Sequence, residues 1–175
     1  MKLRWIYRIP PKWRARVLRA GFNLHPGFRS MGGKVIEVTP DLSAMKIRLP
    51  LHWRTRNALG SIFGGSLFGV TDGPHPLLLM VSLGEDVIVW DKQASIRFRR
   101  PAYCTLYTWC RVTAEDKDRI QSALEEHQEV THDFVISLED QAGEVYAIVE
   151  RTLYIAHRRH YSQKKKAQSE RKQEG

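Results

Sequence analysis

The sequence SIFGGSLFGVTDGPHPLLLMV, residues 61–81, carries one carboxylate, Asp72, in an otherwise apolar stretch. Between Arg56 and Glu85 no other side chain is formally charged at neutral pH. A lone buried carboxylate costs several kcal/mol unless it is hydrogen-bonded or neutralised. We therefore expect Asp72 to act as a base whose pKa is raised by burial, or to cap the helix portion that starts at Pro74.

Other residues that could take part in catalysis precede and follow Asp72 at short separations in the sequence. Five residues separate Asn57 from Phe63-Gly64-Gly65, and six separate those glycines from Asp72. Two glycines that open a helix leave the backbone accessible, and an unpaired N–H there can polarise a carbonyl. His75 lies three residues after Asp72, so it could hydrogen-bond to that carboxylate across one turn or be satisfied within the core.

This spacing, together with VWDKQASIRFRRPA at residues 89–102, resembles the hotdog-fold acyl-CoA thioesterases. In the phenylacetyl-CoA thioesterase type the pattern is Asn-x5-His-Gly-Gly-x6-Asp, with the aspartate on the central helix. The resemblance spans roughly residues 10 to 156 and is closest to a branch catalogued as a domain of unknown function. It implies a homodimer, or a dimer of dimers, in which the aspartate and the glycine amide of one site come from different subunits.

The resemblance also implies a role for each matching residue. Asp72 would be the general base or the nucleophile that hydrolyses an acyl thioester. Gly64 and Gly65 would supply the oxyanion donors, and Asn57 would orient the water or the carbonyl. No cofactor and no metal follow from it.

Two departures from the enzyme pattern favour an alternative. Phe63 stands where the enzymes have histidine, and Asp72-Gly73-Pro74 replaces Asp-Thr-Ala. Because Pro74 cannot donate a helical hydrogen bond, we expect the helix to kink there. The alternative function is a non-catalytic hotdog module that binds an acyl-CoA or a fatty acyl group.

Four further residues near this motif are candidates for binding the substrate. Phe63 and His75 would line the site, and Arg54 and Arg56 flank its approach. Guanidinium forks suit the phosphates of CoA, although exposed arginines are common on any surface. The two cysteines lie outside any metal-ligand pattern, so no metal site is expected.

The pattern of apolar residues predicts an α+β fold. An apolar helix from about Gly64 to Leu83 needs covering on most sides, and a curved antiparallel sheet wrapped around it would do this. We expect a helix from Pro11, strands within 34–51 that turn at Pro40-Asp41, strands within 86–100 and 104–112, a helix within 114–128, and strands within 131–140 and 143–157.

The chain divides into a hotdog domain at 33–156, an N-terminal helix with its connecting loop at 1–32, and a basic tail at 157–175. The tail has too little apolar surface to form a core, so we expect it to be disordered. The net charge is +9, but residues 1–20 alone hold seven Lys/Arg and no acid. Because the excess lies at the ends, we expect no specific nucleic-acid partner, whereas the tail could contact anionic surfaces.

Residues 58–83 are long enough to cross a membrane, but their glycines and prolines and the central Asp72 favour a buried helix. The N-terminus lacks the continuous apolar region of a signal peptide. We therefore expect a cytoplasmic protein.

Overall fold

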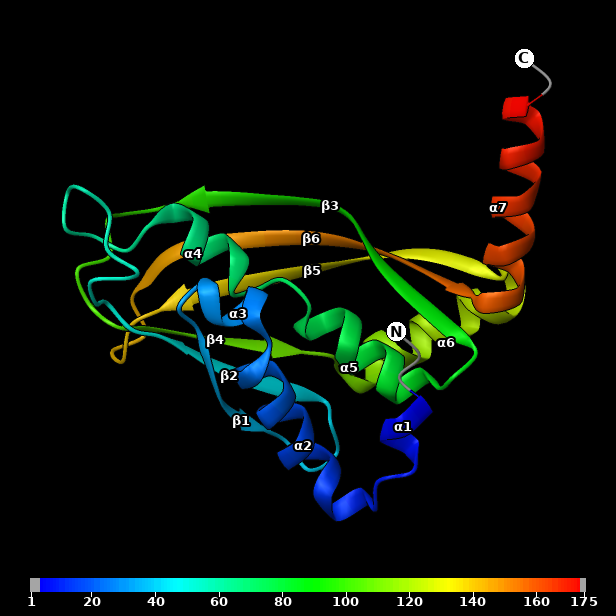
Figure 1. Cartoon of the computed structure of the whole chain (residues 1–175), viewed down its shortest axis with the longest axis horizontal. Helices are drawn as coiled ribbons and strands as arrows, with labels where there is room; N and C mark the ends of the chain where they lie inside the picture. Colours follow the sequence, from blue (N-terminus) through cyan, green and yellow to red (C-terminus); the bar gives the residue numbers. More distant parts are fainter. Residues whose placement is uncertain (1–3, 174–175) are drawn as a thin grey trace.

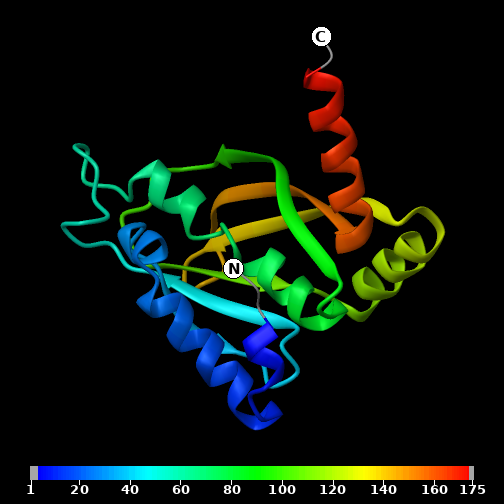
Figure 2. The ribbon, with the colours of Figure 1, turned by 45° about the vertical axis from the view of Figure 1, so that its right-hand side comes forward.

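Residues 4–173 are described by the computed structural model, and residues 1–3 and 174–175 lie outside it. Six antiparallel strands form one sheet in the order β1-β2-β4-β5-β6-β3. They are β1 (Lys34–Val38), β2 (Ala44–Leu49), β3 (Val87–Phe98), β4 (Leu106–Arg111), β5 (Glu129–Glu139) and β6 (Val145–His157). The sheet curves around helices α4 (Gly64–Gly69) and α5 (Pro74–Leu83), as Figures 1 and 2 show. The predicted α+β architecture is confirmed.

The central helix is broken in two where the proline was expected to kink it. Pro74 begins α5, and its preceding residue Gly73 has φ 92°, a left-handed conformation that favours glycine. Residues 70–73 form the turn between α4 and α5. The break changes the direction of the chain next to Asp72, and this fixes where that carboxylate points.

Apolar burial holds α5 inside the curve of the sheet. Leu78 and Leu79 are fully buried, which explains why this helix is apolar on nearly all sides. Strand side chains pack with them in one cluster of buried apolar residues. Helix α4 packs in a second such cluster. The first cluster includes Val89, Phe134, Leu153 and Ile155, and the second includes Ile47, Leu67, Val70 and Val149.

Three helices precede the sheet: α1 (Arg4–Tyr7), α2 (Pro11–Leu24) and α3 (Pro26–Ser30). The predicted start of α2 at Pro11 is confirmed. Asn23 at the end of α2 bonds both ways to the backbone of Val35, each at 2.8 Å between N and O. This amide pair fastens α2 to the edge strand β1.

The C-terminal tail is a helix, α7 (Arg158–Gln173), where we expected disorder. Its Lys, Arg, Gln and Ala residues are good helix formers, and its first turns are supported by polar contacts in place of an apolar face, such as the bond from Ser162 Oγ to the Arg158 carbonyl. Figure 1 shows α7 projecting from the body of the molecule. Lys164 Nζ lies 2.7 Å from Glu129 Oε2 on β5, and hydrogen bonds from Lys164 and Tyr154 lower the pKa of Glu129 to about 2.

Helix α6 (Ala114–His127) connects β4 to β5. Thr113 and Asp116 form a capping box at its first turn. Within residues 4–173, none of the helices is both long and apolar enough to cross a bilayer.

Candidate active site

Asp72 lies on the surface of the chain, at the break between α4 and α5. Its side chain is 65% exposed, whereas the sequence predicted a buried carboxylate. The difference arises because the turn at Gly73 carries the residue off the apolar face of the helix. The N-cap of α5 is Gly73, and no described side chain caps this helix. The capping role considered for Asp72 therefore finds no support.

The neighbour of Asp72 is a buried arginine, Arg151 on β6, whose side chain is only 3% exposed. Its Nη1 donates to Asp91 Oδ1 on β3 at 2.9 Å and to Asp72 Oδ1 at 3.4 Å. Its Nε donates to Thr71 Oγ1 at 3.1 Å, and its Nη2 donates to the Phe68 carbonyl at 3.3 Å. The guanidinium thus joins the break in the central helix to two strands of the sheet.

The electrostatic setting of Asp72 favours proton uptake. Partial desolvation by the surrounding chain raises the pKa of Asp72 above its ordinary value, and the charge of Asp91 raises it further. Arg151 opposes part of this increase. Because one side of the carboxylate remains open to solvent, a substrate can reach it. A carboxylate with a raised pKa and open access has the properties of a general base.

Sequence reasoning missed Arg151 and Asp91, although a signal was present. Arg151 interrupts the inward apolar positions of β6, Ala147, Val149, Leu153 and Ile155, all of which are fully buried. Asp91 likewise continues the inward series of Val87 and Val89 on β3. A charged residue at a position that the period of two assigns to the core indicates an internal partner.

His75 lies in the core and not beside Asp72. It is 2% exposed, its Nε2 lies 3.1 Å from the Arg111 carbonyl oxygen, and its ring stacks on Phe134 at 4.2 Å between centroids. Burial lowers the pKa of His75 to about 4, so the ring is neutral at physiological pH. The structure therefore differs from the predicted placement of His75 on the substrate side.

Asn57 organises the loop that precedes α4. Its Nδ2 donates to Ser61 Oγ at 2.9 Å, and its Oδ1 accepts from the N–H groups of Leu59 and Ser61 at 2.9 and 3.1 Å. The same loop exposes Arg54, whose guanidinium lies over the Trp53 ring at 4.7 Å from the centroid. In the described chain these contacts shape the loop and do not join Asn57 to Asp72.

Gly64 and Gly65 open α4 as predicted. A Cβ built on Gly65 would come within 2.3 Å of the Phe63 ring, and one on Gly64 within 3.1 Å of the Phe98 ring. Both rings are more than half exposed. No described residue accepts a hydrogen bond from the N–H of either glycine. The N–H groups of Gly64 and Gly65 are thus free to donate, and two solvent-facing aromatic rings lie close to these glycines. Arg56, also exposed, pairs through its backbone with Ile62 just before these glycines.

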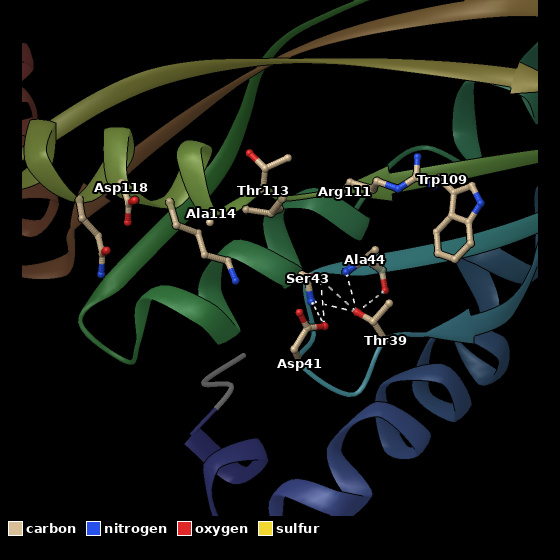
Figure 3. Close-up of a pocket in the computed structure, with 12 residues that line it drawn as sticks. Thr39, Asp41, Ser43, Ala44, Trp109, Arg111, Thr113, Ala114 and Asp118 are labelled. Atoms are coloured by element: carbon tan, nitrogen blue, oxygen red, sulfur yellow. Dashed lines mark hydrogen bonds between the residues drawn. The ribbon is translucent and has the colours of Figure 1, made fainter.

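A hollow of about 510 Å³ lies elsewhere, between the β1–β2 turn, the end of β4 and the start of α6 (Figure 3). None of the residues predicted for the site lines it. Its one carboxylate on the β1–β2 turn is engaged locally, since Asp41 accepts from the hydroxyl and the N–H of Ser43. The arrangement around Asp72 is therefore the better candidate site. Among residues 4–173, no three His, Cys, Asp or Glu side chains come together to hold a metal ion.

Residues 14–155 match the family described as a domain of unknown function, DUF4442. The chain belongs to this family. No curated protein matches the chain. The match covers the whole sheet except the last two residues of β6, together with the break that holds Asp72.

Solved structures show which fold this DUF4442 chain has. A protein of unknown function from Pseudomonas aeruginosa, described as a probable thioesterase, has a TM-score of 0.73 at 22% identity, over 81% of this chain and 95% of that one. A mutant thioesterase from the same organism has a TM-score of 0.61 at 13% identity, over 82% and 94%. A thioesterase from Haemophilus influenzae has a TM-score of 0.61 at 11% identity, over 82% and 91%. The hotdog fold predicted for this chain, the fold of these thioesterase-like proteins, is thereby confirmed.

Proposed function

We propose that this DUF4442 chain hydrolyses acyl thioesters, with an acyl-CoA as the substrate class. The observation that carries the proposal is the Asp72 carboxylate, which is open to solvent, has a raised pKa and is held at the helix break by Arg151. Asp72 takes a proton from water while the water oxygen attacks the thioester carbonyl. The tetrahedral intermediate then expels the thiolate, which takes that proton back from Asp72 and leaves as the free thiol, so the carboxylate is regenerated. The products are a carboxylic acid and a thiol.

The other site residues have different roles in this proposal. The N–H groups of Gly64 and Gly65 are free to stabilise the developing oxyanion, and Phe63 and Phe98 offer apolar contact for an acyl chain. Arg54 and Arg56 are exposed where the phosphates of CoA would pass. Asn57 supports the reaction by shaping the loop before α4, because its polar atoms already bond within that loop.

A homodimer completes the proposal. The resemblance to hotdog thioesterases implies that the glycine amide of one subunit serves the aspartate of the other. Among the described strands, β3 pairs only with β6, so its outer edge is available to a second copy. Sedimentation equilibrium tests this assembly, and a protein that stays monomeric at all concentrations would remove the shared site from the proposal.

The test of function is release of free thiol from short, medium, long and aromatic acyl-CoAs. We expect hydrolysis by the wild type and a loss of about a hundredfold or more in kcat/KM for Asp72→Asn. Asp118→Asn, a change of the same chemistry on the exposed surface of α6, is the matched control and should retain full activity. Turnover by Asp72→Asn at the wild-type rate would contradict the assignment.

An acyl-binding module without turnover is the second candidate. It is favoured by Phe63, an exposed aromatic ring over Gly65 where the enzymes of this type have histidine. Calorimetry with the same acyl-CoAs separates the two functions. Saturable binding with no thiol released by the wild type would establish the module and exclude the enzyme.

The charged helix α7 suggests a partner as well. We propose that it contacts anionic surfaces, because it projects from the body and carries exposed Lys164, Lys165 and Lys166. Co-sedimentation with phosphatidylcholine vesicles, with and without phosphatidylglycerol, tests this. We expect the full chain to bind only the vesicles that contain phosphatidylglycerol. A chain that ends before Arg158 should lose this binding, and equal binding by both chains would refute the role of α7.

A further inference from the structure

The buried charge of Arg151 requires a counter-ion, and the structure offers two carboxylates. An unpaired buried guanidinium would be strongly destabilising, so at least one of them must remain ionised beside it. Thr71 and the Phe68 carbonyl accept two further N–H groups, but they carry no charge to neutralise it. The choice between Asp72 and Asp91 therefore decides which carboxylate is committed to structure and which is free to react.

The two carboxylates differ in distance and exposure. Asp91 Oδ1 lies 2.9 Å from Arg151 Nη1, a normal charge-assisted hydrogen bond, whereas Asp72 Oδ1 lies 3.4 Å from the same nitrogen. The Asp91 side chain is 30% exposed and that of Asp72 is 65% exposed. The shorter contact and the drier position both belong to Asp91.

We propose that Asp91 is a positioning residue of this site: it is the counter-ion of Arg151 and thereby leaves the Asp72 carboxylate free to accept a proton from the attacking water. This inference rests on the proposed function and deepens it. Arg151 fixes the helix break through Thr71 and Phe68, so the position of Asp72 does not depend only on its own longer contact of 3.4 Å with the guanidinium. Asp91 acts on Asp72 both through Arg151 and through its own charge, and in this proposal it makes no contact with the substrate.

The charges that face Asp72 are few. Arg151 comes from β6 and Asp91 from β3, while His75 on α5 turns into the core against Phe134. If Asp91 loses its charge, Arg151 keeps only Asp72 as an anionic partner within the described chain. The direct repulsion by Asp91 is then also removed, and the guanidinium should move toward Asp72 and stabilise its ionised form. The base becomes weaker because its proton is released at lower pH.

The variant Asp91→Asn tests this, with two readouts. In carbon NMR the carboxyl carbon of Asp72 should titrate at lower pH in Asp91→Asn than in the wild type. In thioester hydrolysis the acid limb of the kcat/KM profile should move to lower pH, and kcat on the plateau should fall about tenfold. Glu150→Gln, which removes an exposed carboxylate next to Arg151 on the outer face of β6, is the control and should change neither readout. Asp91→Glu keeps the counter-ion and should restore both readouts toward the wild type.

The two ways of failing are distinguishable. Absence of hydrolysis with every thioester refutes the proposed function, whereas the Asp72 titration still reports on Asp91. An Asp72 titration that does not move in a folded Asp91→Asn overturns the inference even if hydrolysis is found. If Asp91→Asn does not fold, nitrogen NMR of the wild type decides: the Arg151 guanidinium signals should stay constant while Asp72 titrates, and signals that follow Asp72 would make Asp72 the counter-ion.

Discussion

His75 makes the folded chain sensitive to acid, although it lies outside the candidate site. Burial, reinforced by the nearby charge of Arg151, lowers the pKa of His75 from its ordinary 6.5 to about 4, and the hydrogen bond to the Arg111 carbonyl offsets only part of this. Between these two values the unfolded chain binds the proton and the folded chain does not. Stability is therefore fully present above the unfolded pKa and is lost as the pH falls toward the folded one.

The size of the effect follows from the two pKa values. A separation of this kind removes about 3 kcal/mol from the free energy of unfolding once both states are protonated. At about pH 5 roughly 2 kcal/mol of it should already be lost, because the unfolded histidine is then almost fully protonated. A loss of this size is a large fraction of the stability of an ordinary domain.

Urea unfolding of the wild type and of His75→Gln, followed at several pH values between about 7 and 4, measures this loss. Glutamine cannot titrate, yet its amide can still donate to the Arg111 carbonyl. The difference between the two free energies should change by roughly 2 kcal/mol from neutral pH to about pH 5, while contributions from other groups cancel. Both proteins are compared at one concentration, since assembly would shift the apparent stability. Parallel pH profiles for the two proteins would refute the neutral core histidine.

Three further outcomes are expected. Asn23→Ala breaks both amide bonds to Val35 and should lower the free energy of unfolding by about 1–3 kcal/mol in urea titrations; no loss would mean that α2 does not depend on this pair. Gly73→Ala places a Cβ at φ 92° and should cost about 1–3 kcal/mol with a lower Tm, and an unchanged Tm would argue against the left-handed break. Lys164→Ala removes a solvent-accessible ion pair with Glu129 and should change stability by less than about 1 kcal/mol, with helix content by circular dichroism nearly unchanged.

The parts of this fold that could be predicted from sequence are those set by local chemistry. Pro11 and Pro74 mark helix starts because proline lacks the N–H that those positions leave unused. The alternation of Met45, Ile47 and Leu49 marks the inner face of β2, and all three are buried. The prediction of a disordered tail is wrong because apolar content does not measure helix propensity, which favours α7.

The candidate site was predicted only in part. The position of Asp72 at the helix break follows from Asp72-Gly73-Pro74, but its exposure does not, because the turn conformation sets the direction of the side chain. Arg151 meets Asp72 and Asp91 across 79 and 60 residues of chain. Such contacts depend on which strands pair and in which register, and periodicity alone does not determine this.

In the proposed homodimer, the outer edge of β3 would couple assembly to the proposed hydrolysis. A long strand with unpaired backbone groups is a template for another strand, and charged residues such as Lys92 and Arg97 discourage unspecific pairing along it. Asp91 lies on that same strand, so a second copy seated along the edge would lie near this carboxylate. If the proposed dimer shields Asp72 from water, dilution that separates the copies should lower the pKa of Asp72 and make it a weaker base. The proposed activity per chain should then depend on protein concentration, and the dissociation constant of the proposed dimer would set the concentration at which hydrolysis begins.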